Sequence, residues 1–298
     1  MREVEIVGKK VGDEHPCYVL AEIGINHNGD LDLAKRLVDA AVQAGCNAVK
    51  FQKRTPELCV PEAQRQVMRE TPWGIMPYIE YRHRVEFSED EYDAIDKHCR
   101  ENAIPWFASC WDLPSLQFFR RFNPPAYKIP SALITDMELL SACRETGKPL
   151  IMSTGMSTME QIRKAVEVVG QERLVLCHCT STYPCPPAEL NLRMITTLRD
   201  EFNCPIGYSG HEVGLQTTTA AAVLGACLIE RHITLDRSMW GSDQAASVEP
   251  HGLARLVRDI RVIETAMGDG RKRVYESEHA VRRKLRPVST LEPRPGPE

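Results

Sequence analysis

Short apolar runs alternate with longer amphipathic segments over most of this chain, and this alternation limits the fold more than any other feature. Strands that are apolar on both faces form a parallel sheet covered by helices, because neither face can be left to water. Eight strand–helix pairs are the number that closes a TIM (β/α)8 barrel. The predicted strands are 17–24, 46–52, 104–109, 126–130, 149–153, 174–179, 204–209 and 226–232, and the predicted helices are about 30–44, 88–102, 112–122, 135–147, 157–169, 188–201, 213–225 and 250–267.

Residues that begin and end helices stand where this division requires them. Asp30 precedes the first amphipathic segment, and Ser88 with Glu91 and Ser157 with Glu160 form two predicted capping boxes. Glycines suit helix ends because they tolerate the left-handed backbone found there. Four of them follow predicted helices: Gly45, Gly147, Gly170 and Gly225. An open doubly wound sheet is the alternative fold for the same pattern.

Both ends of the chain and one long connection lie outside the barrel pattern. Two apolar stretches near the N-terminus flank a G-K-K-V-G turn, which predicts a short hairpin beneath the barrel. The connection 53–87 is too long for a simple turn, and structureless loops of this length usually act as lids or binding loops. Loops after strands build the site of a TIM barrel, so we expect this lid on the catalytic face. We predict the barrel domain over 1–275, and a C-terminal helix with a flexible Pro-rich tail over 276–298.

Composition excludes several classes of protein. The net charge of -4 gives no basic excess with which to bind a nucleic-acid backbone. No apolar run is long enough to span a membrane, and the first twenty residues carry charges throughout, so we expect neither a membrane span nor a signal peptide. The eleven cysteines are odd in number, many lie in apolar runs, and no C-x-x-C pair occurs. We therefore expect reduced cysteines and a cytoplasmic protein.

Two histidines end consecutive predicted strands. His211 follows the strand 204–209, His232 ends the strand 226–232, and the segment between them is rich in Ala and Thr, as a helix packed on a sheet would be. A right-handed strand–helix–strand unit makes the two strand tips neighbours. Two neutral imidazoles there could hold one divalent metal and leave its other positions open to substrate and water. The alternative is that each histidine is only a hydrogen-bonding loop residue.

Strand parity places charged side chains inside the barrel, where branched apolar residues are normal. These residues are Glu22, Lys50, Gln52, Lys128, Glu230 and His232. Buried charges are costly unless they meet a ligand or one another. We predict an anionic ligand held by Lys50 and Lys128, with Glu22 available for acid/base chemistry. A purely structural Glu/Lys network is the alternative. Hydroxyl groups that suit a phosphate stand at the strand ends, namely Ser131, Ser153, Thr180, Ser181 and Ser209.

Seven motifs, mostly at strand ends, resemble those of the sialic acid synthases. They are A-E-I-G-I-N-H-N-G-D (21–30), V-K-F-Q-K (49–53), Y-K-I-P-S (127–131), S-T-G-M (153–156), H-C-T-S-T-Y-P (178–184), I-G-Y-S-G-H-E (206–212) and E-R-H-I-T-L-D…G-S-D-Q-A-A-S-V-E-P (230–250). That family condenses phosphoenolpyruvate with an aldose such as N-acetylmannosamine. The resemblance spans about residues 15 to 270, and its middle and C-terminal motifs are nearer to the animal branch.

The resemblance implies a role for each matching residue. His211 and His232 match the ligands of a divalent metal, usually Mn²⁺, with Mg²⁺ or Co²⁺ as alternatives. Glu22 matches a glutamate near C2 of phosphoenolpyruvate. Positions that match phosphoenolpyruvate contacts are Lys50, Lys128, Ser131, Ser153 and Ser209, and positions that face the acceptor sugar are Gln52, Tyr183 and Asp243. The implied reaction is attack by C3 of phosphoenolpyruvate on the open-chain aldehyde, addition of water at C2 and loss of phosphate.

One departure concerns the C-terminal part of the family pattern. Relatives usually continue into a small antifreeze-like domain that, in a homodimer, reaches the partner's barrel and offers an arginine to the acetamido group of the sugar. That arginine has no counterpart in this sequence. We expect a homodimer, and either an acceptor other than N-acetylmannosamine, a separate antifreeze-like protein, or a replacement contact from Arg82 and Arg84 in the lid.

Two other classes of function fit part of the pattern. A metal-dependent aldolase or lyase acting on a 2-keto acid would also use a barrel, two histidines and a glutamate. A barrel that has lost catalysis and serves as a binding module is the non-enzymatic alternative. The presence of Glu22, Lys50, Lys128, His211 and His232 together favours a synthase over a binding module.

Overall fold

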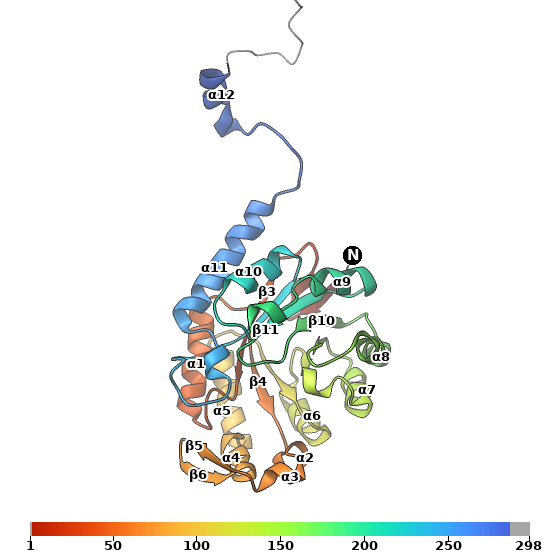
Figure 1. Cartoon of the computed structure of the whole chain (residues 1–298), viewed down its shortest axis with the longest axis vertical. Coiled ribbons are helices and arrows are strands. Elements are labelled where there is room, and N and C mark those ends of the chain that lie inside the picture. The colour runs from red at the N-terminus through yellow and green to blue at the C-terminus, as the bar shows by residue number, and fades with distance from the viewer. Residues whose placement is uncertain (1, 287–298) are drawn as a thin grey trace, which may run out of the picture. The chain divides into compact units, whose positions relative to one another are not determined.

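The chain forms a closed barrel of eight parallel strands, which confirms the predicted TIM barrel and excludes an open sheet, because the last strand β12 pairs with the first barrel strand β3. A computed structural model describes residues 2–286. The barrel strands are β3 Tyr18–Gly24, β4 Ala48–Lys53, β7 Trp106–Cys110, β8 Tyr127–Ile129, β9 Leu150–Ser153, β10 Leu174–Cys179, β11 Ile206–Gly210 and β12 Leu228–His232. Figure 1 shows the surrounding helices.

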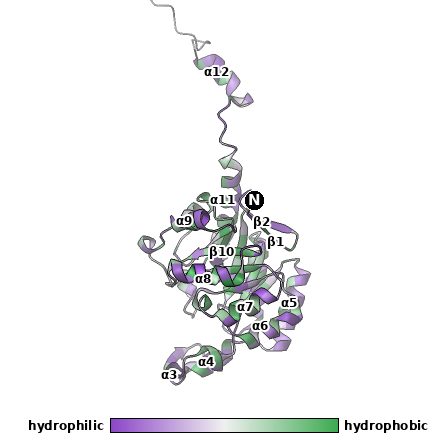
Figure 2. Cartoon of the chain, turned by 90° about the vertical axis from the view of Figure 1, so that its right-hand side faces the viewer, coloured by the Kyte–Doolittle hydropathy of each residue, from purple (hydrophilic) through white to green (hydrophobic). Residues whose placement is uncertain are grey.

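A helix follows each barrel strand, and most of these helices are amphipathic. Apolar faces of these helices pack on the outward-facing strand residues to form the main hydrophobic core, and polar residues lie on the outside, as the colours of Figure 2 show. These helices are α1 Leu31–Gln43, α5 Glu89–Glu101, α6 Leu113–Phe119, α7 Met137–Glu145, α8 Met159–Val169, α9 Met194–Glu201, α10 Gln216–Val223 and α11 Pro250–Met267. Short 3-10 turns are η1 Arg120–Phe122, η2 Ser131–Leu133, η3 Pro187–Glu189 and η4 Gln244–Ala246.

The predicted caps of α1 and α5 are confirmed and that of α8 is corrected, and α9 begins only at Met194, later than its predicted start near residue 188. Asp30 accepts a hydrogen bond from Leu33 N at the start of α1, and Ser88 forms the predicted capping box of α5. The capping box of α8 is formed by Thr158 and Gln161, so the predicted box one residue earlier was wrong. Both registers place a hydroxyl three residues before a side chain that can bond back to it, and the sequence pattern does not separate them.

The barrel interior is layered from apolar to polar. A second hydrophobic cluster contains inward-facing residues from the N-terminal halves of the strands, such as Leu20, Phe107 and Val175. The N-terminal hairpin, β1 Glu3–Ile6 and β2 Lys9–Gly12, belongs to the same cluster through its buried residues Val4, Ile6 and Val11. The hairpin therefore packs against the apolar end of the interior, as predicted, and the opposite end is left to polar side chains.

We expected a structureless loop after β4. The connection instead carries short elements of its own. They are α2 Pro56–Cys59, α3 Glu62–Arg65, the antiparallel pair β5 Met68–Thr71 and β6 Gly74–Pro77, and α4 Tyr78–Val85. A small apolar cluster of Ile25, Met76, Tyr81 and Val85 ties this segment, called the lid below, to the loop after β3. Each lid element is too short to show a periodicity from which the sequence could predict it.

The chain divides into two compact units, residues 1–263 and 264–298, with the boundary inside α11. In the second unit, η5 Glu276–Glu278 precedes α12 His279–Leu285, which matches the predicted C-terminal helix. The predicted Pro-rich tail lies largely beyond residue 286 and outside the described residues. Among the described helices, none combines the length and the apolar character that a membrane crossing requires.

Candidate active site

A cavity of about 190 Å³ opens at the C-terminal ends of the barrel strands, and every barrel strand contributes a side chain to its wall. The side chains contributed by the strands are Glu22, Lys50, Gln52, Ser109, Lys128, Ser153, Cys179, Ser209, Glu230 and His232. The loops that follow the strands add further predicted site residues, namely Ser131, Ser181, Tyr183 and His211. The structure thus gathers most of the predicted site at one place.

Two lysines and two glutamates form a buried charged cluster in this cavity. Lys50 Nζ lies 2.7 Å from Glu22 Oε2 and 3.9 Å from Glu230 Oε1, and it donates a hydrogen bond to Ser109 Oγ at 2.8 Å. Lys128 Nζ lies 4.0 Å from the same Glu230 oxygen and donates to Ser153 Oγ. Glu230 therefore lies between both ammonium groups, and Glu22 faces only one of them.

Because of this asymmetry, the two carboxyl groups differ in pKa. Burial raises the pKa of Glu22 to about 7, with the nearby charge of Glu230 adding to the shift and Lys50 opposing it. Burial also acts on Glu230, but Lys128 and Lys50 together hold its pKa below the ordinary value. Glu22 can therefore exchange a proton near neutral pH, which suits acid/base catalysis, while Glu230 stays ionised.

A glycine shapes the mouth of the cavity next to Glu22. Gly24 has a φ of +57° at an irregularity in the pairing of β3 with β4. A Cβ atom at this position would lie 3.2 Å from both Gln52 Nε2 and Glu22 Oε1, and 3.4 Å from a ring carbon of His232. A larger residue would therefore strain the backbone and crowd three predicted site residues.

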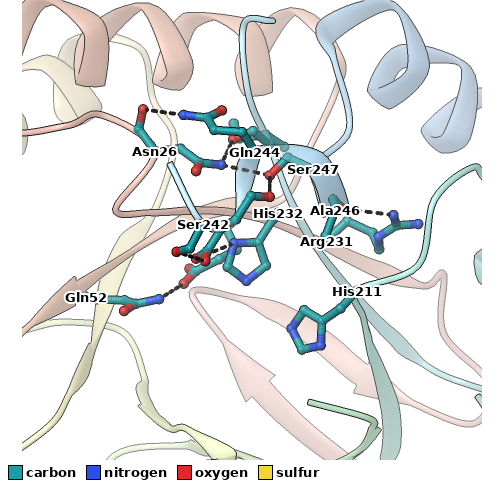
Figure 3. A network of polar contacts seen from close by, with 12 residues as sticks. Asn26, Gln52, His211, Arg231, His232, Ser242, Gln244, Ala246 and Ser247 are labelled. Carbon is teal, nitrogen blue, oxygen red and sulfur yellow. Dashed lines mark hydrogen bonds and ion pairs between the residues drawn. The ribbon is translucent and has the colours of Figure 1, made fainter. Parts of the chain in front are cut away.

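The two histidines lie side by side, as predicted, with ring centroids 5.3 Å apart (Figure 3). His211 Nδ1 bonds the carbonyl oxygen of Thr180 at 2.8 Å. A carbonyl can only accept, so Nδ1 carries a hydrogen, and in the neutral ring Nε2 keeps its lone pair. Burial lowers the pKa of His232 to about 3, and its buried Nδ1 has no hydrogen-bond partner among the described residues.

These features fit a divalent cation held by two neutral imidazoles. His232 Nδ1 lies 3.6 Å from Asp243 Oδ2, which adds a nearby negative charge. No group of three or more His, Cys, Asp or Glu residues with ligand geometry occurs in the described part of the chain. A cation here would therefore take its remaining ligands from substrate and water.

The positions expected to face the acceptor sugar lie on the lid side of the site. Gln52 donates a hydrogen bond to Glu22 Oε1 at 2.9 Å, and the Tyr183 ring lies 4.0 Å from the His211 ring. Gln52 and Tyr183 line both the first cavity and a second one of about 320 Å³, which Asp243 also lines. The two cavities therefore meet at these side chains.

Comparisons with known proteins identify the family of this chain. Residues 37–272 match the NeuB family. The chain is 38% identical to the N-acetylneuraminate-9-phosphate synthase of Homo sapiens over 93% of this chain and 79% of that protein, and 36% identical to the N,N'-diacetyllegionaminic acid synthase of Legionella pneumophila over 95% and 82%. The chain belongs to the NeuB family. It is therefore an enzyme, a synthase of the sialic acid type that forms a carbon–carbon bond.

A solved structure of a sialic acid synthetase shows the same fold. The N-acetylneuraminic acid (sialic acid) synthetase from Leptospira borgpetersenii serovar Hardjo-bovis, in complex with citrate, matches with a TM-score of 0.85 and 32% identity. The match covers 96% of this chain and 98% of that one. A truncated 3-deoxy-D-arabino-heptulosonate 7-phosphate synthase from Thermotoga maritima, at 14% identity and a TM-score of 0.67, shares the fold alone.

The remaining predicted site residues of this NeuB-family enzyme lie farther from the charged cluster. Arg82 is buried, pairs with Glu86 and lines the second cavity. Arg84 is half exposed, pairs with Glu80 and lines none of the cavities described here. Thr180 bonds the backbone of Glu189 through its hydroxyl, and its contribution to the site is the carbonyl that orients His211.

Four polar or aromatic residues of the site were missed from the sequence, and one of them is Ser109 of β7, which accepts a hydrogen bond from Lys50. Arg54 and Trp111 form part of the wall toward the lid, and the Arg54 guanidinium stacks 3.6 Å from the Trp111 ring. Cys179 ends β10 inside the first cavity, with its sulfur 3.8 Å from His211 Nδ1. Strand parity could have identified Cys179, because it lies two residues beyond the inward-facing Cys177. Arg54 and Trp111 follow their strands, where parity no longer applies.

The loop after β12 is fixed to the motif I-N-H-N-G by a polar network (Figure 3). Asn26 Nδ2 donates to Ile233 O and to Ser247 Oγ, both at 2.8 Å, and Ser247 Oγ donates to the carbonyl of Asp243. Gln244 Nε2 donates to Asn26 O. These contacts hold the segment that carries Asp243 against the mouth of the barrel, so this part of the motif is structural.

Arg231 stands between two site residues on β12 but points away from the cavity, as strand parity predicted (Figure 3). Its guanidinium is buried, lies 3.2 Å from Glu212 Oε1 and donates to the carbonyl of Gly214. Burial acts to raise the pKa of Glu212, but Arg231 and the Thr218 hydroxyl hold it below the ordinary value. This pair fixes the loop after His211 from behind the strand.

Proposed function

We propose that this enzyme condenses phosphoenolpyruvate with the open-chain form of an aldose, giving a 3-deoxy-2-keto sugar acid and phosphate. The observation that carries the proposal is the buried pair Lys50 and Lys128 beside a carboxyl group with a pKa near 7. Two ammonium groups and a ring of hydroxyls suit a small, highly charged anion. Phosphoenolpyruvate, which carries a carboxylate and a phosphate, meets that requirement.

The second cavity would take the acceptor. Its contact with the first cavity at Gln52 and Tyr183 would bring the aldehyde carbon next to C3 of phosphoenolpyruvate. C3 attacks the aldehyde carbon and forms the new carbon–carbon bond, while the carbonyl π electrons pass to the aldehyde oxygen, which takes up a proton. Positive charge then develops at C2, and a water molecule adds there while Glu22 accepts its proton. Loss of phosphate breaks the bond between C2 and the bridging oxygen, and the new hydroxyl at C2 gives up its proton to the departing phosphate to leave the keto acid.

The chain's own charges would support each of these steps. Lys50 and Lys128 would neutralise the anion and the departing phosphate, and Glu230 would stay ionised opposite the positive charge at C2. Bound by His211 and His232, a divalent metal, in relatives usually Mn²⁺, would supply Lewis acidity to the aldehyde oxygen. The metal, a homodimeric state and a cytoplasmic location stay predictions.

A screen tests the proposal. Purified enzyme with phosphoenolpyruvate and Mn²⁺ is offered a panel of five- and six-carbon aldoses, acetylated, unacetylated and phosphorylated, and inorganic phosphate is measured. We expect release with at least one aldose and almost none without. Release of pyruvate from a 2-keto sugar acid, with no phosphate from phosphoenolpyruvate, would instead indicate an aldolase.

A further inference from the structure

A chain of polar contacts joins Arg54, directly after β4, to the acid/base group of the proposed reaction. One terminal nitrogen of the Arg54 guanidinium donates a hydrogen bond to Gln52 Oε1. The amide nitrogen of Gln52 in turn donates to Glu22 Oε1 at 2.9 Å, and the other oxygen of Glu22 lies 2.7 Å from Lys50 Nζ. Both oxygens of Glu22 are therefore held, and one of them is held by a side chain that itself contacts Arg54.

The guanidinium determines which end of the Gln52 amide faces Glu22. A guanidinium has only donors and an ionised carboxylate has only acceptors, whereas an amide has one oxygen that accepts and one nitrogen that donates. With its oxygen toward Arg54 and its nitrogen toward Glu22, the amide satisfies both neighbours. A rotated amide would set donor against donor and acceptor against acceptor. Without the guanidinium, rotation is allowed whenever Glu22 carries a proton, because the amide oxygen then accepts the carboxyl O–H.

Arg54 is itself held in place by contacts that do not involve Gln52. Its guanidinium stacks 3.6 Å from the Trp111 ring, and its backbone N–H donates to Glu86 Oε2 at 3.0 Å. The guanidinium forms no ion pair with the described residues, and Arg54 Nε has no hydrogen-bond partner among them. Stacking fixes the plane of the guanidinium. Gln52 Oε1 is thus the acceptor toward which this charge is directed.

The backbone around Gln52 and Arg54 is anchored separately from their side chains. Tyr92 Oη donates to the carbonyl oxygen of Gln52 at 3.0 Å, and Asp112 accepts the backbone N–H of Thr55 at 2.6 Å. These contacts use main-chain atoms of the segment 52–55, so they stay when a side chain at position 52 or 54 is replaced. Arg54→Met therefore removes the guanidinium and leaves the backbone of Gln52 in place.

We infer that Arg54 is a positioning residue, which keeps the amide N–H of Gln52 on Glu22 and so holds the Glu22 carboxyl group in the orientation that acid/base chemistry requires. This inference rests on the proposed function, because Glu22 needs a fixed orientation only if it accepts the proton of the water that adds at C2. Each carboxylate oxygen keeps a lone pair for that proton. Arg54 acts through Gln52 and not on the reacting atoms.

Exchange of the Gln52 amide hydrogens with water tests the positioning without turnover. In enzyme labelled with ¹⁵N at its glutamine side chains, the NMR signal of Gln52 is the one that Gln52→Met lacks. We expect the hydrogen that bonds Glu22 to exchange at least tenfold faster in Arg54→Met than in the unchanged enzyme. Arg54→Lys keeps a donor for Gln52 Oε1 and should keep most of the protection. Arg69→Met, on the exposed face of the lid, is the matched control and should leave the exchange unchanged.

A double-mutant cycle on kcat tests the consequence for turnover. Arg54→Met should lower kcat at least tenfold and leave the KM values for phosphoenolpyruvate and the aldose within about threefold, because Arg54 acts on the acid/base group and not on substrate binding. Since Arg54 acts through Gln52, the double variant Arg54→Met with Gln52→Met should be no slower than Gln52→Met alone, within about twofold. Arg54→Lys should recover most of kcat.

The two measurements separate failure of the positioning from failure of the proposed function. Protection of the Gln52 amide that depends on Arg54, without any condensation, would keep the positioning of Glu22 and remove the proposed function. Three results would each overturn the role of Arg54: protection that is absent in the unchanged enzyme or equal in Arg54→Met, a higher KM for the aldose with kcat unchanged, and losses of kcat that multiply in the double variant.

Discussion

Charged side chains in the barrel mouth occupy positions that alternate with the outward-facing core residues of the same strands. Lys50 lies between Val49 and Phe51, and Lys128 lies between Tyr127 and Ile129, all of which belong to the core outside the sheet. This two-residue period is a property of any strand, so the sequence alone was enough to predict which side chains face inward. The partners of each charge depend on neighbouring strands and could not be predicted in that way.

Lys128 is expected to contribute more to the binding of phosphoenolpyruvate than to the binding of the aldose. Replacing it by Met removes a cation from the anion site, so the KM for phosphoenolpyruvate should rise at least tenfold. The KM for the aldose should stay within about threefold of its value in the unchanged enzyme. Steady-state kinetics with each substrate varied in turn measures both values. Glu230 also loses a partner, so thermal unfolding is recorded as a control. Equal changes in both KM values would indicate a structural lysine.

The two imidazoles are expected to be needed for metal binding and for catalysis. His211→Ala and His232→Ala should each lower kcat at least a hundredfold and weaken Mn²⁺ binding, measured by calorimetry on the apo-protein. Both side chains are buried at the cavity wall, so circular dichroism checks the fold of each variant. A chelator should abolish activity and Mn²⁺ or Co²⁺ should restore it. Full activity in the chelator would rule out the metal.

The sequence predicted closely the strands and helices that have a clear hydrophobic period, but it did not predict the elements of the lid. The barrel strands and their helices repeat a pattern long enough to recognise, whereas the lid elements are short and share a small apolar cluster. Its position depends on contacts between distant parts of the chain. Asp112, at the N-cap of α6, is one of them: it accepts from Ser115 N at 2.7 Å and from Thr55 N, at the start of the lid, at 2.6 Å.

Asp112 is therefore expected to stabilise the enzyme in a pH-dependent way. Burial acts to raise its pKa, but hydrogen bonds from Thr55 and Ser115 hold the pKa below the ordinary value. A lowered pKa in the folded state means that the contribution is complete above about pH 4 and is lost as the pH falls through the folded-state pKa. Asp112→Asn replaces one of the two accepting oxygens by an NH2 group and leaves one of these N–H groups without its acceptor, so it should cost about 1 to 2 kcal/mol at pH 7, and less below pH 4.

Urea unfolding at pH 7, 5 and 3 measures this difference. Asp200→Asn, an exposed aspartate of α9, is the matched control and should change the free energy of unfolding by less than about 0.5 kcal/mol. A penalty for Asp112→Asn that stays constant down to pH 3 would contradict the assigned role of its charge.

At the scale of the whole molecule, one end of the barrel interior contributes to stability and the other end carries the residues of the active site. Apolar side chains and the N-terminal hairpin fill one end of the interior, and the other end holds the charged cluster among loops that the scaffold positions. The sequence predicted this division because the strands themselves become polar toward their C-terminal ends. Arg54 and Trp111 were missed because loops bring them to the site, and no strand or helix period covers them.

The most direct test of the central claim follows one oxygen atom. Phosphoenolpyruvate labelled with ¹⁸O at the oxygen that bridges C2 and phosphorus is incubated with the enzyme, Mn²⁺ and an aldose that passes the screen, and both products are analysed by mass spectrometry. We predict one phosphate per sugar acid formed, with the label in the phosphate. Label retained in the keto acid, or phosphate released at the same rate without an aldose, would contradict the proposed condensation.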